Sequence, residues 1–413
     1  MKNTLILYNI FIKIYHLAII IASVKNQKAK QWISGRKNIF KKIADSVNPK
    51  DYIVWFHCAS LGEFEQGRPV IEKYKNDFPE HKILLTFFSP SGYEIRKNYQ
   101  GADYIFYLPL DSKRNAKKFI NIVNPKKVIF VKYEFWYHYL NLLYKKNIPT
   151  FIISTIFRKN QLFFRWYGNW YRKMLKKFSF IFVQNEISKM LLESININNV
   201  LITGDTRFDR VSAISEQSKS LPLIEKFRNN KTCLIAGSTW EKDENILIEF
   251  INSTKFNFKY IIAPHEIFPE NINRIKKSIN KQSLLYSKAN EENILDTEVL
   301  IIDNIGILSS LYRYGDIALI GGGFGKGIHN ILEAAAFGLP VLFGPKYQKF
   351  NEAIELLKLK GAFSFKDYND FSDIIKKLQS DKIYLKNTGE ISKNFVNSKK
   401  GVTNKILDKI SNI

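Results

Sequence analysis

The sequence contains little cysteine and comparatively few acidic residues. Only Cys58 and Cys233 occur in 413 residues, and they form no CxxC pair. This argues against a disulfide framework or a structural zinc site and favours a reducing compartment. The 38 acidic residues face 63 lysines and arginines, for a net charge of +25. Such an excess favours anionic partners: nucleic acid, an acidic membrane surface or phosphorylated substrates. No internal repeat or low-complexity tract interrupts a chain that is 45% hydrophobic, which indicates globular cores.

Long apolar runs are absent except at the start. Residues 4–24 form a stretch roughly long enough to span a bilayer. Its polar residues share one helix face: Asn9, Lys13, His16 and Ser23. We therefore predict a membrane-anchoring helix over residues 1–30, lying in the interface or holding one face against protein; a buried helix of a soluble domain is the alternative. The lysine-rich residues 25–42 favour a body on the cytoplasmic side, against anionic lipid.

Strand-like and helix-like segments alternate along the rest of the chain. This alternation predicts α/β domains with parallel sheets and helices on both faces. We expect a first domain over 31–211, a linker over 212–230 and a second domain over 231–413, whose last helix is a candidate to return to the first domain. The expected strands are 52–60, 82–89, 104–110, 127–134, 150–155, 180–185, 233–239, 260–266, 299–304, 317–323 and 340–344. Asp111 is expected to cap the helix that follows it.

A glycine-rich segment, "GGGFGKGIHNILEAAAFGLPVLFGP", occupies residues 321–345. It has neither the spacing of a Walker A loop nor that of a G-x-G-x-x-G dinucleotide site. It follows an expected strand and precedes an expected helix that starts at His329 and ends at Gly338. Small residues there allow an anion to approach backbone N–H groups, which predicts a nucleotide or sugar-phosphate site.

Five motifs occur in order along the chain: "ASLGE" (59–63), "VQNE" (183–186), "TGDTRFD" (203–209), "AGSTWEKDE" (236–244) and the glycine-rich segment. Together they resemble the 3-deoxy-D-manno-octulosonic acid (Kdo) transferases of Gram-negative bacteria. The resemblance implies the GT-B architecture, two Rossmann-like domains facing a cleft. It implies inverting transfer of Kdo from CMP-Kdo to the lipid A precursor (lipid IVA) at the cytoplasmic face of the inner membrane. It also implies no cofactor and no required metal.

The resemblance assigns roles to individual residues. Glu63 matches the family's general base, a role that suits the chemistry because a sugar hydroxyl needs a carboxylate to take its proton. An ordinary acid in the first turn of a helix is the alternative interpretation of Glu63. The expected acceptor contacts are Ser60, Gly62, Glu134 and Arg158. The expected donor contacts are Arg207, Ser238, Thr239, His265, Gly323, Gly325, Lys326, Gly327, His329, Asn330 and Glu333.

The sequence departs from the family pattern in places. Arg207 stands where the family has a lysine, and Ile328 and Ile331 interrupt its Gly-Gly-His-Asn-Pro. Arg158 is a candidate to replace an arginine that the family has two positions earlier.

Two other interpretations stay open. One is a GT-B transferase or epimerase that uses a different nucleotide sugar. The other is a membrane-peripheral nucleic-acid-binding protein, suggested by the basic, aromatic residues 158–178. The same stretch suits a helix docked on a bilayer. We expect no nucleic-acid partner, because the polar candidates cluster after strands, as they do in an enzyme.

Overall fold

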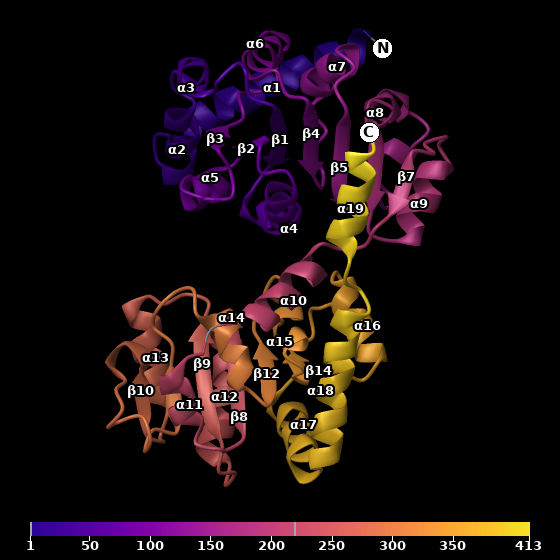
Figure 1. Ribbon diagram of the computed structural model, residues 1–413. Coiled ribbons are helices and arrows are strands. Elements are labelled where there is room, and N and C mark those ends of the chain that lie inside the picture. The colour runs from indigo at the N-terminus through magenta and orange to yellow at the C-terminus, as the bar shows by residue number, and fades with distance from the viewer. Residues whose placement is uncertain (1, 219) are drawn as a thin grey trace. The chain divides into compact units, whose positions relative to one another are not determined.

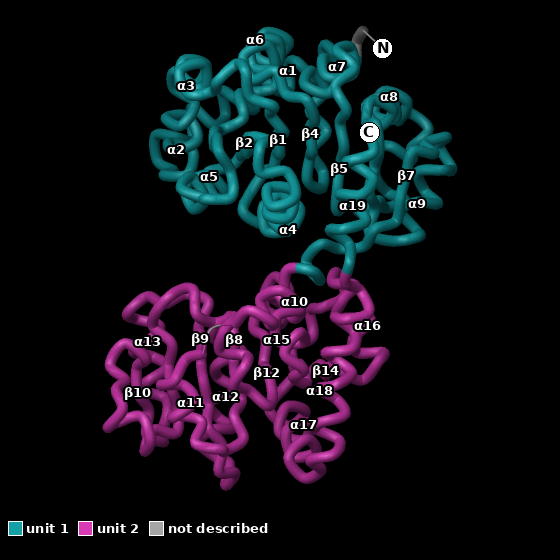
Figure 2. Tube along the Cα trace, in the orientation of Figure 1, with its two compact units in different colours: residues 1–209, 401–413 teal, residues 210–400 magenta. Residues whose placement is uncertain are grey.

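The computed structural model describes residues 2–218 and 220–413. The chain divides into two compact units (Figure 2), residues 1–209 with 401–413 and residues 210–400. Each is built on a parallel sheet flanked by helices (Figure 1).

Unit 1 contains a seven-stranded sheet among its described residues, in the order β3-β2-β1-β4-β5-β6-β7. Its central strand β1 is buried at every position, as expected for a parallel strand covered on both faces. The strands are β1 (Ile53–Cys58), β2 (Lys82–Phe87), β3 (Tyr104–Tyr107), β4 (Lys127–Val131), β5 (Thr150–Thr155), β6 (Phe180–Val183) and β7 (Val200–Ile202).

The helices of unit 1 cover both faces of this sheet. Two separate apolar clusters result, one with α3, α6 and α7 on one face, the other with α4 and α19 on the opposite face (Figure 1). The helices are α1 (Lys2–Ala22), α2 (Gln27–Gly35), α3 (Ile39–Ser46), α4 (Leu61–Asp77), α5 (Pro90–Arg96), α6 (Lys113–Val123), α7 (Tyr137–Lys145), η1 (Leu162–Phe164), α8 (Asn169–Leu175), α9 (Glu186–Glu193) and α19 (Val402–Ser411). Helix α10 (Arg207–Gln217) begins in unit 1 and continues into unit 2.

Unit 2 repeats the plan with the order β10-β11-β9-β8-β12-β13-β14. Its strands are β8 (Cys233–Thr239), β9 (Lys259–Pro264), β10 (Ser283–Leu285), β11 (Val299–Ile301), β12 (Ile317–Ile320), β13 (Val341–Phe343) and β14 (Ala362–Ser364). Its helices are α11 (Pro222–Arg228), α12 (Glu241–Ser253), α13 (Pro269–Ser278), η2 (Tyr286–Lys288), α14 (Leu308–Leu311), η3 (Tyr312–Tyr314), α15 (Leu332–Ala336), α16 (Asn351–Lys358), α17 (Tyr368–Ser380) and α18 (Lys382–Asn397).

The chain crosses from unit 1 to unit 2 within a helix. The units divide between Asp209 and Arg210, within α10. Residues 212–230, predicted to be a linker, hold the end of α10 and α11. The chain returns to unit 1 through α19, whose start is fixed by the carboxylate of Asp209, which accepts 2.6 Å hydrogen bonds from the backbone N–H groups of Gly401 and Thr403.

Two local predictions were wrong. The N-cap of α6 is Ser112, whose hydroxyl accepts a 3.2 Å hydrogen bond from the Asn115 N–H. Asp111 instead accepts hydrogen bonds from Tyr8 and from the first turn of α7. Three strands, β7, β10 and β14, were not predicted. Each has three residues, lies at a sheet edge and is only partly buried, so it lacks the long apolar run of an interior strand.

Candidate active site

The strand order creates one topological switch point in each sheet, a place where the chain stops adding strands on one side and continues on the other. In unit 1 the chain runs from β1 outward to β3 and then crosses to β4 on the other side of β1. In unit 2 it runs from β8 outward and crosses to β12 on the other side of β8. Loops leaving such a strand pair diverge to opposite faces, so ligands of doubly wound sheets bind at the carboxyl ends there. Glu63 and Glu134 follow β1 and β4, whereas Thr239 ends β8 and the glycine-rich segment follows β12.

Glu63 lies in the first turn of α4 and is half-buried. The N-cap of this helix is Ser60, whose hydroxyl donates a hydrogen bond to Glu63 Oε2. Oε1 has no hydrogen-bond partner among the described residues. Ser60 therefore orients one of the Glu63 oxygens. Gly62, between them, is exposed.

Glu134 is buried and belongs to a polar network at the carboxyl edge of the same sheet. Its Oε2 accepts hydrogen bonds from His57 Nε2 at 3.1 Å and Trp136 Nε1 at 2.6 Å. On the other side of the His57 ring, Nδ1 lies 2.8 Å from Thr86 Oγ1. Trp55 Nε1 donates to that hydroxyl at 2.7 Å, and Nδ1 also lies 3.1 Å from the Thr86 carbonyl oxygen. The His57 ring therefore links Thr86 on β2 to the Glu134 carboxylate after β4.

The remaining candidates of unit 1, Arg158 and Arg207, follow β5 and β7. Burial raises the pKa of Tyr133, the Arg158 guanidinium lowers it, and the charge of Glu63 adds to the rise, so the three side chains lie within electrostatic range. Arg158 itself is exposed. Arg207 pairs with Asp205 at 2.7 Å. Its loop is tied to the helix of Glu63 through a 2.5 Å hydrogen bond from the Thr206 hydroxyl to the Gln66 carbonyl.

The glycine-rich segment of unit 2 folds back on itself. The strand before it ends at Ile320 and the helix after it covers only Leu332–Ala336, so both are shorter than predicted. The His329 N–H donates to the Gly321 carbonyl at 3.0 Å. A Cβ on Gly321 would lie 2.2 Å from the Ser238 carbonyl oxygen. The segment therefore needs glycine for close backbone packing, and the five-residue helix contributes less dipole than we expected.

The predicted donor contacts of unit 2 gather at this edge. Ser238 has φ +53°, a left-handed conformation that is costly for a serine and is typical of functional sites. Thr239 is buried and donates to Glu244 at 2.9 Å, so its hydroxyl is already used within the fold. The Asn330 side-chain amide donates to Glu333 at 3.0 Å. The others, Gly323, Gly325, Lys326 and Gly327, belong to the folded-back segment, where Gly325 and Lys326 are exposed.

Three aromatic rings stack beside the segment. His265 stacks on both Trp240 and His329, with ring centroids 4.7 Å and 4.4 Å away. Those two rings lie side by side, with centroids 6.4 Å apart and planes 9° from parallel. Trp240 Nε1 donates to His329 Nε2 at 2.9 Å. Burial, and secondarily the nearby His265, lower the pKa of His329 to about 4. His329 is therefore neutral at pH 7 and accepts the indole N–H.

Sequence reasoning missed three residues of these sites. Trp240 directly follows the "AGST" motif, and His57 interrupts an otherwise apolar strand; either signal could have been used. Asp243 is buried, which raises its pKa, and its Oδ2 accepts from the Gly322 N–H at 2.8 Å and the Trp240 N–H at 3.0 Å. It thereby joins the start of α12 to the glycine-rich segment. No group of three or more metal-ligating side chains occurs among residues 2–218 and 220–413, and the metal-free reaction stays a prediction.

Comparison with known proteins identifies the family. Residues 29–210 match the family model of 3-deoxy-D-manno-octulosonic-acid transferase (kdotransferase). The chain is 30% identical over 340 residues to the 3-deoxy-D-manno-octulosonic acid transferase of Aquifex aeolicus, covering 81% of this chain and 88% of the relative. It is 27% identical over 347 residues to that of Haemophilus influenzae, covering 81% and 80%.

Solved structures establish the fold. The chain resembles UDP-GlcNAc 2-epimerase from Neisseria meningitidis with a TM-score of 0.60 at 17% identity, covering 87% of this chain and 100% of the other. It resembles MurG from Acinetobacter baumannii with a TM-score of 0.57 at 10% identity, covering 88% and 100%. At such identities the likeness concerns the fold alone. Sequence and fold together show that the chain belongs to the Kdo transferase family of glycosyltransferases and has the GT-B fold.

Proposed function

We propose that this Kdo transferase moves Kdo from CMP-Kdo to the lipid A precursor, lipid IVA, with inversion at the anomeric carbon. The observation that carries the proposal is the position of Glu63, a half-buried carboxylate at the switch point of unit 1, with one oxygen oriented by Ser60 and the other unpartnered among the described residues. A carboxylate so placed can act as a general base on a hydroxyl.

The proposed step is a direct displacement. The acceptor hydroxyl oxygen forms a bond to the anomeric carbon while its proton passes to Glu63. The bond between that carbon and the phosphate oxygen breaks, and its electron pair leaves on CMP. Negative charge grows on the phosphate, so cations and backbone N–H groups that face it lower the barrier. Arg207, Lys326 and the glycine-rich segment are the groups we assign to this task.

The stacked rings beside the glycine-rich segment are candidates to bind the base of CMP. Trp240, His265 and His329 offer stacked aromatic rings at the carboxyl edge of the unit 2 sheet. A pyrimidine base can stack on such rings. We therefore assign the cytosine of CMP to this stack. CMP should raise the temperature of unfolding, whereas UDP, the nucleotide expected for an epimerase of this fold, should not.

Membrane attachment is part of the proposal. Thr4–Ala22 is long and apolar enough to cross a bilayer by length and composition. However, α1 holds one face against unit 1 through Tyr8 and Asn9, which bond to Asp111 and His138. Its other face exposes large apolar side chains, among them Leu7, Phe11, Ile14, Leu17 and Ile21. This arrangement favours a helix lying in the interface.

A second exposed aromatic site supports this placement. Within the basic, aromatic residues 158–178, Trp166 is 90% exposed. The following helix α8 contacts α1, because the rings of Trp170 and Tyr8 lie 5.6 Å apart. Tryptophan is enriched at membrane interfaces. We propose that α1 and Trp166 dock on the cytoplasmic face of the inner membrane, next to anionic lipid.

The test is incubation with CMP-Kdo and lipid IVA, with the product read by mass spectrometry. Glu63→Gln should lower the turnover by about 10²–10⁴-fold, as loss of a general base does. Its fold and CMP binding should persist, because the amide oxygen can still accept from Ser60. Glu72→Gln removes the same charge from the same helix and should stay near the wild-type rate. Near-normal turnover in Glu63→Gln would remove this residue from its assigned role.

A further inference from the structure

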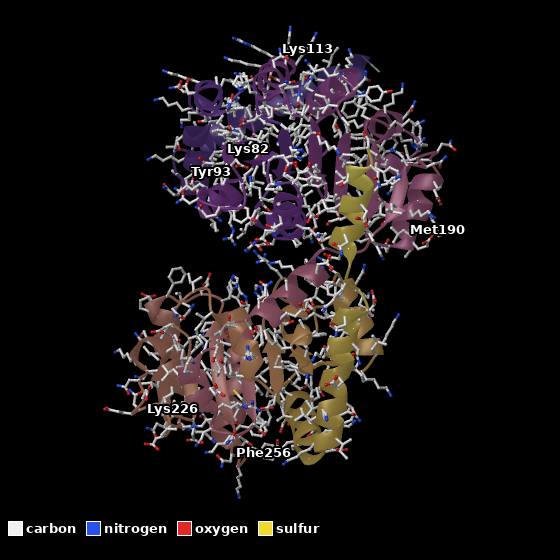
Figure 3. The ribbon with its side chains drawn as sticks, viewed as in Figure 1. Lys82, Tyr93, Lys113, Met190, Lys226 and Phe256 are labelled. Carbon is white, nitrogen blue, oxygen red and sulfur yellow. The ribbon has the colours of Figure 1, made fainter. Side chains whose placement is uncertain are left out.

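A large cavity lies in unit 1 beside α1. Its volume is about 1060 Å³, and its walls come from α1, the segment around α2 and α3, the loop after β3 and the start of α6. Five lysines and two arginines line it, against a single acid, Asp111. Lys113, at the outer surface of α6 in Figure 3, is one of these cations. The lining is therefore strongly positive.

The one acid does not neutralise these cations. Both oxygens of Asp111 are already engaged: Oδ2 accepts from the Tyr8 hydroxyl at 2.5 Å and the His138 N–H at 3.0 Å, and Oδ1 accepts from the Tyr139 N–H at 3.2 Å. These bonds fix α1 to the start of α7, so Asp111 holds the cavity wall in place. The positive charge is left for another partner.

Arg36 strengthens this conclusion. Its guanidinium is partly buried and forms no ion pair with any described residue. It donates to three backbone carbonyls, those of Trp32, Phe88 and Leu108, at 2.7–3.1 Å. A guanidinium has five N–H groups, so two are left. Burial lowers the pKa of Arg36 to about 9, and it is still a cation at pH 7. The guanidinium also faces the rings of Trp32, Tyr107 and Phe88 at 3.7–5.0 Å. Carbonyls and ring faces therefore hold Arg36 in place without an acidic partner, and its positive charge adds to that of the lining lysines.

The cavity is apolar as well as positive. Ile12 of α1, Trp32 and Phe40 line it together with the cations. It also adjoins α1, whose outer face exposes apolar side chains that we assign to the membrane. A cavity lined by both apolar side chains and cations fits an acyl chain joined to a phosphate group.

The cavity also borders the carboxylate network. Arg36 donates to the Phe88 carbonyl, and the Phe88 ring lies 4.7 Å from that of Trp136. Trp136 in turn donates to Glu134. Arg36, which lines the cavity, is therefore linked through Phe88 and Trp136 to the carboxylate that follows β4.

We infer that this cavity binds a phosphate group of the lipid acceptor and the adjoining acyl chain, with Arg36 and the lysine rim on the phosphate. The inference rests on the proposed function, because it takes the acceptor to be a phosphorylated, acylated sugar. It assigns to the cavity a substrate contact that is separate from the reacting carbon.

The test uses two matched double variants of the full chain. Lys41→Glu with Lys113→Glu reverses two charges that line the cavity. Lys42→Glu with Lys117→Glu reverses two exposed charges on the same helices that do not line it. We expect the acceptor KM of the cavity variant to rise about tenfold or more, as loss of charge-assisted contacts does. The control variant should stay within about twofold, and the KM for CMP-Kdo should not change in either.

A change in the acceptor provides a second test of the inference. With an acceptor from which the phosphate groups have been removed, the KM values of the wild type and the cavity variant should converge. Equal acceptor KM values in both variants, or an equal rise in both, would overturn the inference, since the effect would then be absent or would come from overall charge at the membrane.

Binding without turnover separates the two proposals. If the wild type transfers no Kdo, the proposed function fails, but sedimentation with phosphatidylcholine vesicles that carry lipid IVA still tests the cavity. Weaker sedimentation of the cavity variant than of the control supports the inference. Preferential binding of the wild type to phosphatidylglycerol vesicles, lost in the cavity variant, would show that a bulk phospholipid occupies the cavity and would overturn it.

Discussion

Protonation of His329 should destabilise unit 2. Its folded-state pKa is about 4, lowered from 6.5 chiefly by burial. A histidine whose pKa falls on folding contributes stability that is present above pH 6.5 and is lost as the pH falls toward 4, because the unfolded chain takes up the proton first. The difference corresponds to about 3 kcal/mol. Since the ring is partly exposed and solvent screens its charge, we expect about 1–2 kcal/mol.

The structural reason lies in the ring stack. Trp240 Nε1 donates to the lone pair on His329 Nε2, and a proton there would replace an acceptor by a donor. The His265 ring, stacked at 4.4 Å, adds repulsion whenever it is charged. Protonation of His329 should therefore loosen its contacts with both rings.

The assay combines a titration with unfolding. NMR of the histidine ring protons should show one resonance that titrates near pH 4 and disappears in His329→Gln, which keeps an acceptor for Trp240. Thermal unfolding should shift downward between pH 6.5 and 4.5 in the wild type and less in this variant. His265→Gln should raise the pKa of His329. A His329 that titrates above pH 6 would refute the reasoning, whatever the unfolding data.

Further predictions concern close packing and the carboxylate network. Gly321→Ala should cost about 1–3 kcal/mol of stability and weaken CMP binding, because its Cβ would overlap the Ser238 carbonyl. Gly325→Ala, whose Cβ meets nothing nearer than 3.6 Å, should leave thermal unfolding unchanged; an equal loss of stability in the two variants would contradict this. His57→Leu should lower thermal stability by about 2–4 kcal/mol, because the buried Glu134 loses an N–H donor. An unchanged melting temperature would show that the hydrogen bond between His57 and Glu134 does not contribute to stability.

Much of the fold could be predicted from the sequence because parallel strands buried on both faces appear as continuous apolar runs. The β1 sequence "IVWFHC" and the β5 sequence "TFIIST" are such runs, and both are fully buried. The strands that escaped prediction are short and lie toward the sheet edges. The five motifs also indicated the family, which the relatives confirm. Their assigned site roles stay predictions.

The hydrogen bonds of the buried polar side chains could not be predicted, because they join residues far apart in the chain. Asp111 looked like a helix cap from its neighbours, yet its hydrogen bonds go to α1 and to α7. His57 and Glu134 are 77 positions apart and meet only because β1 and β4 pair. No local pattern reports such a contact.

The sequence by itself determined the type and order of the elements, the position of Glu63 after a buried strand and the family, because all of these depend on local periodicity and short motifs. Tertiary structure alone decided that α1 holds its polar face against unit 1, that Arg36 lacks an acidic partner, and that cations from three separate segments line one cavity. The physical reason is that charge compensation and cavity shape depend on which distant segments pack together, and strand pairing and helix packing settle that only once the chain has folded.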